Sequence, residues 1–184
     1  MASWSTPPEG RSGRAVILRG PLGAGKSTIA RTLALRTRGK VVSIDAILET
    51  MRWDGGSFRL FLRANIAAAR LARPHLRDGR TVIFDGNFYW QRAIDDLRRR
   101  LGCPMAVVTL RLPLRLCIER DRARAQPYGA EAARAVFAKS RRVSSGVKVD
   151  ARGTVDQVAD RVLAVIRDSA RYAQPMVRAR PRPS

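Results

Sequence analysis

The sequence predicts an α/β fold in which helices cover both faces of a five-stranded parallel sheet. Short apolar runs alternate with longer stretches of helical periodicity from Arg14 to Arg167, and this alternation is typical of parallel sheets. A glycine-rich segment joins the first apolar run to the first helical stretch. The length of 184 residues and the hydrophobic content of 45% are those of a single globular domain.

The expected elements follow from the period of the apolar residues. Strands are expected at Ala15–Leu18, Val41–Ile44, Thr81–Phe84, Met105–Leu112 and Val147–Val149. Helices are expected at Lys26–Thr37, Ala46–Arg52, Ser57–Arg77, Gln91–Leu101, Leu114–Arg124, Ala130–Arg141 and Thr154–Asp168. The single domain would then span residues 14–168, between a disordered leader (1–13) and a flexible tail rich in proline and arginine (169–184).

The glycine-rich segment matches the phosphate-binding pattern G-x-x-x-x-G-K-[ST] between an expected strand and an expected helix. Its glycines let backbone N–H groups surround an anion, and the helix adds the positive end of its dipole. Lys26 would reach the β- and γ-phosphates, and Ser27 would bind Mg²⁺. The expected nucleotide-binding residues of this segment are Gly20, Gly23, Ala24, Gly25, Lys26, Ser27 and Thr28.

Two aspartates are expected to face this loop, because ligands of parallel sheets bind beyond the carboxyl ends of the strands. Asp45 follows the second expected strand and Asp85 follows the third. We expect Asp85 to hold Mg²⁺ together with Ser27, directly or through water, or to orient the acceptor. Two structural alternatives remain open: Asp45 is only the N-cap of the next helix, or Asp85-Gly86-Asn87 is only a turn.

The net charge of +21 makes a nucleic-acid partner conceivable. All but four of the 36 basic residues are arginines, and they are spread along the chain without interleaved aromatic residues. A stacking platform for single strands would need such aromatic residues. A nucleic-acid partner is therefore not favoured over a small molecule.

Membrane insertion is not expected, because no apolar run approaches the roughly 18 residues that a spanning helix needs. Cys103 and Cys117 are too few for a disulfide framework or a metal cluster. A cytoplasmic protein, monomeric or homodimeric, fits these features.

The chain resembles the small P-loop kinases over residues 14 to 168. It is most similar to the branch that contains chloramphenicol phosphotransferase and the kinase domain of phage-type polynucleotide kinase. The phosphate loop carries the general resemblance, and "SIDAILETM", "VIFDGNFYWQRAIDDL" and "LPLRLCIERDRAR" narrow it. The resemblance implies one P-loop NTPase domain with a small arginine-bearing lid.

The resemblance also assigns roles to individual residues. Asp45 would be the general base that takes the proton of the acceptor hydroxyl. Arg120, Arg122 and Arg124 would lie on the lid and grip phosphates, although Glu119 or Asp121 could equally be their surface partners. Adenine would pack near the lid and near the loop after the fifth strand, which is Asp150-Ala151-Arg152-Gly153.

These expectations combine into an ATP- and Mg²⁺-dependent phosphotransferase that acts on a hydroxyl of a small acceptor. ATP is expected because no N-K-x-D motif for guanine is present. One alternative is a nucleoside or polynucleotide 5′-hydroxyl kinase, which the charge favours. Leu48 disfavours it, because polynucleotide kinases place an arginine three residues after the catalytic aspartate. The other alternative is a nucleotide-dependent regulatory ATPase. The expected catalytic residues are Lys26, Asp45, Asp85, Arg120 and Arg124, with Arg120 and Arg152 also contacting the nucleotide.

Overall fold

The computed structural model describes residues 13–52 and 56–169. Within them the chain forms a five-stranded, all-parallel sheet in the order β2-β3-β1-β4-β5. This arrangement confirms the predicted fold class. The strands are β1 (Arg14–Arg19), β2 (Lys40–Ser43), β3 (Thr81–Asp85), β4 (Met105–Arg111) and β5 (Val147–Asp150).

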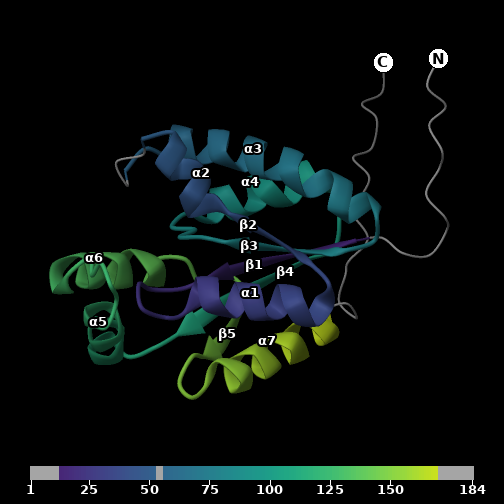
Figure 1. Cartoon of the computed structure of the whole chain (residues 1–184). Helices are drawn as coiled ribbons and strands as arrows, with labels where there is room; N and C mark the ends of the chain where they lie inside the picture. Colours follow the sequence, from purple (N-terminus) through teal and green to yellow (C-terminus); the bar gives the residue numbers. More distant parts are fainter. Residues whose placement is uncertain (1–12, 53–55, 170–184) are drawn as a thin grey trace, which may run out of the picture.

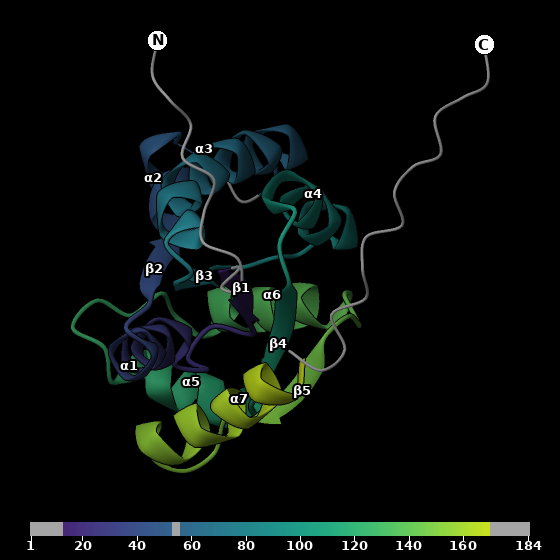
Figure 2. The ribbon, with the colours of Figure 1, turned by 90° about the vertical axis from the view of Figure 1, so that its right-hand side faces the viewer.

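Helices cover both faces of the sheet, as Figures 1 and 2 show. Helices α2, α3 and α4 lie on one face, and α1 and α7 lie on the other. Helices α5 and α6 contact each other at the end of the sheet where the phosphate loop turns. The bounds are α1 (Lys26–Thr37), α2 (Ile44–Thr50), α3 (Phe58–Arg77), α4 (Gln91–Leu101), α5 (Leu114–Arg122), α6 (Ala130–Arg141) and α7 (Val155–Ser169).

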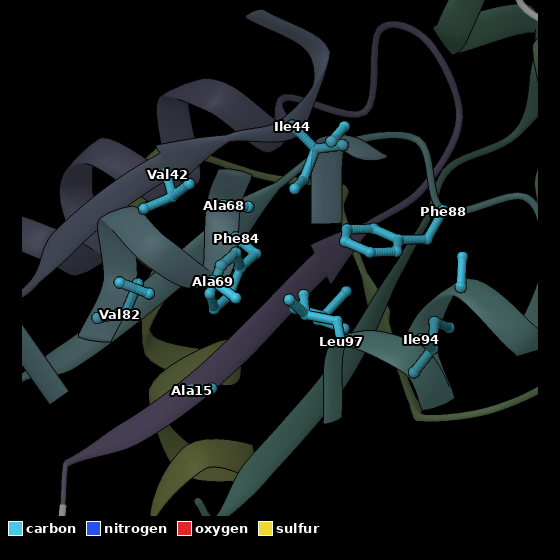
Figure 3. Packing of buried hydrophobic residues seen from close by; sticks show 14 of the residues in the cluster. Ala15, Val42, Ile44, Ala68, Ala69, Val82, Phe84, Phe88, Ile94 and Leu97 are labelled. Atoms are coloured by element: carbon cyan, nitrogen blue, oxygen red, sulfur yellow. The ribbon is translucent and has the colours of Figure 1, made fainter. Parts of the chain in front are cut away.

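The central strand β1 divides the hydrophobic core into two halves. Ala15 and Ile17 face the half under α3 and α4, whereas Val16 and Leu18 face the half under α1 and α7. This alternation follows from the two-residue period of a strand. Figure 3 shows the first half, where Phe84 and Leu97 pack between sheet and helices. Each fully buried Val, Leu or Ile contributes about 1.5–3 kcal/mol, so both halves stabilise the packing of the helices on the sheet.

The start of α2 differs from the prediction. Ile44, expected as the end of a strand, is the first residue of α2, and Ser43 is the N-cap. The Ser43 hydroxyl accepts a hydrogen bond from the backbone N–H of Ala46 at 3.1 Å. Asp45 therefore lies in the first turn of the helix, and the interpretation of Asp45 as only an N-cap is wrong.

Other boundaries differ by one or two residues. Helix α5 ends at Arg122, which leaves Arg124 in the segment before α6, and Ser57 caps α3 instead of opening it. The expected leader and tail lie outside the described residues, except for Gly13 and Ser169. No helix in the described ranges has the length and apolar character that crossing a membrane requires. Both cysteines are free thiols.

Candidate functional site

The phosphate loop connects β1 to α1 and lies tightly against its neighbours. Gly23 and Gly25 have φ values of 77° and 82°, which favour glycine. A Cβ on Gly23 would collide with the carbonyl oxygen of Cys117 in α5. Gly25 is the N-cap of α1, no side chain caps this helix, and its first turn holds no acidic residue. The N–H groups at the start of α1 are thus arranged for an anion.

Lys26 is buried at the base of this loop. Its Nζ donates to the carbonyl oxygens of Gly20 and Pro21, both at 3.2 Å. Burial lowers the pKa of Lys26, while the negative charges of Asp45 and Asp85 act in the opposite direction. The two aspartates predicted from the strand ends therefore lie within electrostatic range of the loop lysine.

A cleft of about 370 Å³ opens between the phosphate loop, α2, the end of β3 and the α5–α6 segment. Such a volume suits a small molecule or part of a nucleotide. The lining residues are Leu22, Lys26, Ser27, Ser43, Asp45, Ala46, Leu48, Glu49, Asp85, Asn87, Arg124, Tyr128, Ala132 and Val136.

Asp45 is held in this cleft by Asn87. The backbone N–H of Asn87 donates to Oδ1 at 3.1 Å, and its Nδ2 donates to Oδ2 at 3.0 Å. Between β3 and this contact, Gly86 has no room for a side chain, because a Cβ would lie 2.8 Å from Cβ of Ile44. The turn after β3 therefore orients Asp45, and a role of Asp85 in the reaction stays a prediction.

The pKa of Asp45 is raised, first by burial and then by the charges of Asp85 and Glu49. Lys26 and the backbone N–H of Asn87 act against this rise without cancelling it. A carboxylate with a raised pKa takes up a proton more readily than an exposed one. The environment of Asp45 is therefore suited to proton transfer.

Two buried side-chain oxygens at the end of β3 and just after it have no hydrogen-bond donor among the described residues. Asp85 is the last residue of β3 and is 5% exposed. Oδ1 of Asp85 and Oδ1 of Asn87 are buried, and no described residue donates to them. Mg²⁺ prefers oxygen ligands and is commonly held by one or two protein groups plus phosphates and water. No cluster of three or more His, Cys, Asp or Glu occurs in the described ranges. The residues present therefore suit a Mg²⁺ ion that is held partly by phosphates and water, and Ser27 lines the same cleft.

The α5–α6 segment brings one of the predicted arginines to the cleft. Arg124 lines it, and its guanidinium lies over the ring of Tyr128, with 5.5 Å to the centroid. Its Nε is 3.6 Å from Oδ1 of Asp121. Asp121 is 1% exposed, and its Oδ2 accepts from the backbone N–H of Gly129 at 2.9 Å. Asp121 is thus a buried anchor for the segment that carries Arg124.

Arg120, Arg152 and Thr28 do not line the cleft. Arg120 donates from Nη1 to the carbonyl oxygen of Ala151 at 3.3 Å. Among the described residues Glu119 pairs with Arg115, and Asp121 lies beside Arg124. Arg152 pairs with Asp150, with Nε 2.8 Å from Oδ2. Both arginines therefore border the loop after β5. Thr28 is exposed on α1, and its carbonyl oxygen accepts from Thr32.

The sequence interpretation missed a buried arginine beside the cleft. Arg19, the last residue of β1, is 1% exposed, and burial lowers its pKa to about 10. It donates to the carbonyl oxygens of Phe88, Val143 and Ser140 at 3.1, 3.0 and 2.6 Å, and to Oγ1 of Thr109 at 3.0 Å. A charged residue directly at the end of an apolar strand was the available signal, because arginine is rarely buried without partners. Arg19 ties the end of α6 to the segment after β3.

The phosphate loop, the parallel sheet and the carboxylates at its edge define a P-loop protein with the fold of the small P-loop kinases. The chain belongs to the AAA domain family, AAA_33, whose model matches residues 16–146. No curated protein sequence matches the chain.

Several solved structures share the fold at low identity. A sugar kinase from Janibacter sp. HTCC2649 superimposes with a TM-score of 0.70 and 21% identity, covering 91% of this chain and 99% of its own. The APS kinase of Mycobacterium tuberculosis, in complex with AMPPNP and APS, superimposes with a TM-score of 0.68 and 19% identity, covering 86% of this chain and 99% of its own. A gluconokinase from Sinorhizobium meliloti 1021 superimposes with a TM-score of 0.66 and 18% identity, covering 89% of this chain and 95% of its own. The likeness establishes the fold of the chain.

Proposed function

We propose that the protein is an ATP- and Mg²⁺-dependent phosphotransferase that moves the γ-phosphoryl group to a hydroxyl of a small acceptor. One observation carries this proposal. The Asp45 carboxylate, buried and held by Asn87, lines the same cleft as Lys26 of the phosphate loop. A proton acceptor thus lies beside a phosphate-binding cation, which is the arrangement that phosphoryl transfer to a hydroxyl requires.

In the proposed reaction the acceptor oxygen attacks the γ-phosphorus, and the bond from that phosphorus to the ADP oxygen breaks. The hydroxyl proton passes to the Asp45 carboxylate. Lys26 and the N–H groups at the start of α1 hold the β- and γ-phosphates and oppose the charge that develops on them. Ser27 and Asp85 are the residues that would hold Mg²⁺, which supplies further charge neutralisation at the phosphates.

The arginines divide between the two sides of the nucleotide. Arg124 lines the cleft, where its charge would stabilise the transferring phosphoryl group. Arg120 and Arg152 border the loop after β5, where we place the adenine. This proposal separates a role in transfer for Arg124 from a role in nucleotide binding for the other two.

A small acceptor is preferred over a polynucleotide. The cleft volume of about 370 Å³ suits a small molecule. Leu48, where polynucleotide kinases place an arginine, is 1% exposed and packs in the core. We also propose a single catalytic domain over residues 14–168 and a location in the cytoplasm.

The test is a phosphorylation screen with labelled ATP across sugars, nucleosides, hydroxylated antibiotics and 5′-hydroxyl oligonucleotides. Asp45→Asn should lower the turnover of any acceptor by about 10²-fold or more, while calorimetry should show ATP affinity within a few-fold of wild type. Helix α2 should persist, because Ser43 caps it. Lys26→Ala should abolish most transfer. Undiminished turnover in folded Asp45→Asn would refute the assignment of the base.

A further inference from the structure

A second cavity, of about 690 Å³, opens beside the cleft, where α3 and α4 begin and α6 ends. It shares no lining residue with the cleft. The side chains that give it its character are Phe58, Tyr89, Trp90, Arg92, Lys139 and Arg142. We call it the α4–α6 pocket. Its volume is within the range of small-molecule sites.

Aromatic rings form one wall of the α4–α6 pocket. Phe58 and Trp90 meet edge to face with their centroids 5.4 Å apart, and Tyr89 and Trp90 do so at 5.9 Å. Rings that contact one another in this way hold their positions and present flat apolar surface. Such a wall suits a planar or aromatic body.

The α4–α6 pocket also carries positive charge, from three cationic side chains. Arg92, Lys139 and Arg142 line the pocket, and no carboxylate among the described residues does. None of the three takes part in an ion pair among the described residues. Lys139 Nζ lies 5.7 Å from the centroid of the Tyr89 ring. Cations gathered without carboxylates repel one another and attract an anionic ligand.

The pocket and the cleft lie end to end along one side of α6. Ala132 and Val136 line the cleft, whereas Lys139, further along α6, lines the pocket, and this spacing is that of a single helix face. Ala132 and Lys139 are seven positions apart, which corresponds to about 10 Å along the helix. The pKa of Tyr89 is raised mainly by burial and, to a smaller extent, by the negative charge of Asp45. A ligand in the pocket can thus extend toward Asp45.

We propose that the α4–α6 pocket binds an anionic group on a planar body of the acceptor, whose hydroxyl lies at Asp45. The inference rests on the proposed phosphotransferase function and narrows its acceptor to small anionic molecules with a flat ring system. The anionic group contacts Lys139 and Arg142, with Arg92 at the start of α4. The ring lies against Trp90.

The test uses two probes that differ only in charge, 6-(hydroxymethyl)-2-naphthoate and 6-(hydroxymethyl)-2-naphthamide. Each carries a hydroxyl at one end of a flat ring system, and only the first is anionic. By calorimetry the naphthoate should bind about tenfold more tightly than the naphthamide. The double variant Lys139→Gln/Arg142→Gln should lose this preference and keep wild-type affinity for ATP. Arg134→Gln, an exposed cation of α6 that lines neither cavity, should retain it.

Binding without a preference for the naphthoate, no binding of either probe, or a preference that survives the double variant would each overturn the inference. A transfer assay with labelled ATP distinguishes a failure of the pocket inference from a failure of the proposed function. Charge-selective binding without transfer contradicts the phosphotransferase but not the pocket, whereas transfer to uncharged acceptors alone contradicts the pocket. Tighter binding of a 5′-hydroxyl oligonucleotide, weakened steeply by salt, would replace the small acceptor with a polynucleotide.

Discussion

Asn87 binds both carboxylate oxygens of Asp45, one through its backbone N–H and one through its side-chain amide. The two residues follow neighbouring strands, because β2 pairs directly with β3 and Ser43 is in register with Asp85. The sheet therefore determines the distance between them. The contact orients a carboxylate that burial makes readier to accept a proton.

Asn87→Ala should lower turnover by about tenfold, because a hydrogen bond to a charged group contributes roughly 1.5–3 kcal/mol. The backbone N–H still holds Oδ1 of Asp45, so the loss should be smaller than in Asp45→Asn. Steady-state kinetics at saturating ATP would measure it. Asn87→Asp should be worse than Asn87→Ala, since it adds a negative charge beside Asp45. Equal turnover of Asn87→Ala and wild type would contradict a positioning role.

The pH dependence of transfer should reflect the raised pKa of Asp45. The base acts when deprotonated, so kcat/KM should fall as the pH decreases through this pKa, which lies above the ordinary aspartate value of 3.8. Asp45→Asn should lose this acid limb. Glu49→Gln should move the limb to lower pH, because Glu49 contributes to the rise. An acid limb at or below the ordinary value would show that another group controls the reaction.

Arg124→Ala should lower kcat more than it changes ATP affinity, because Arg124 lines the cleft. Arg120→Ala should mainly weaken ATP binding, since Arg120 bonds to the backbone of Ala151 after β5. Arg122→Ala is the matched control, an exposed arginine of α5 that lines neither cavity. If all three variants behave alike, the arginines act only as general surface charge.

Arg19→Met should reduce the free energy of unfolding by about 3 kcal/mol or more. Methionine preserves much of the buried volume, yet three carbonyl oxygens and one hydroxyl lose their donor, and each unsatisfied buried group costs about 1–3 kcal/mol. Arg19→Lys should be intermediate, because an ammonium cannot span the same acceptors. Urea denaturation measures both. A fully stable Arg19→Met protein would mean that the end of α6 is held by other contacts.

The elements and the phosphate loop could be predicted because each depends on local pattern. The apolar period predicted every strand and helix, and the error at Ile44 arose because the Ser43 hydroxyl starts α2 directly after β2. The position of Asp45 and Asp85 at one edge followed from the parallel sheet. The hydrogen bonds from Asn87 to Asp45 did not, because they depend on how the turn after β3 meets the start of α2.

Long-range contacts were beyond the sequence interpretation. Arg19 reaches Ser140 and Val143 at the end of α6, and nothing near Arg19 in the chain indicates those partners. Asp121 looked like a surface partner of an arginine; it does lie 3.6 Å from Arg124, but it is buried. The cations of the α4–α6 pocket were indistinguishable from the general arginine excess until folding placed α4 beside α6.

The central place of β1 has a consequence for how the protein can be made. This strand is synthesised before the other strands of the described sheet, yet its neighbours are β3 and β4, with Arg14 opposite Thr81 and Ala15 opposite Met105. Until β4 has been synthesised through Arg111, β1 has at least one unpaired edge of backbone N–H and C=O groups. Pairings of such sequence separation form slowly and expose apolar surface meanwhile. The most buried part of the sheet is thus its most vulnerable part during synthesis.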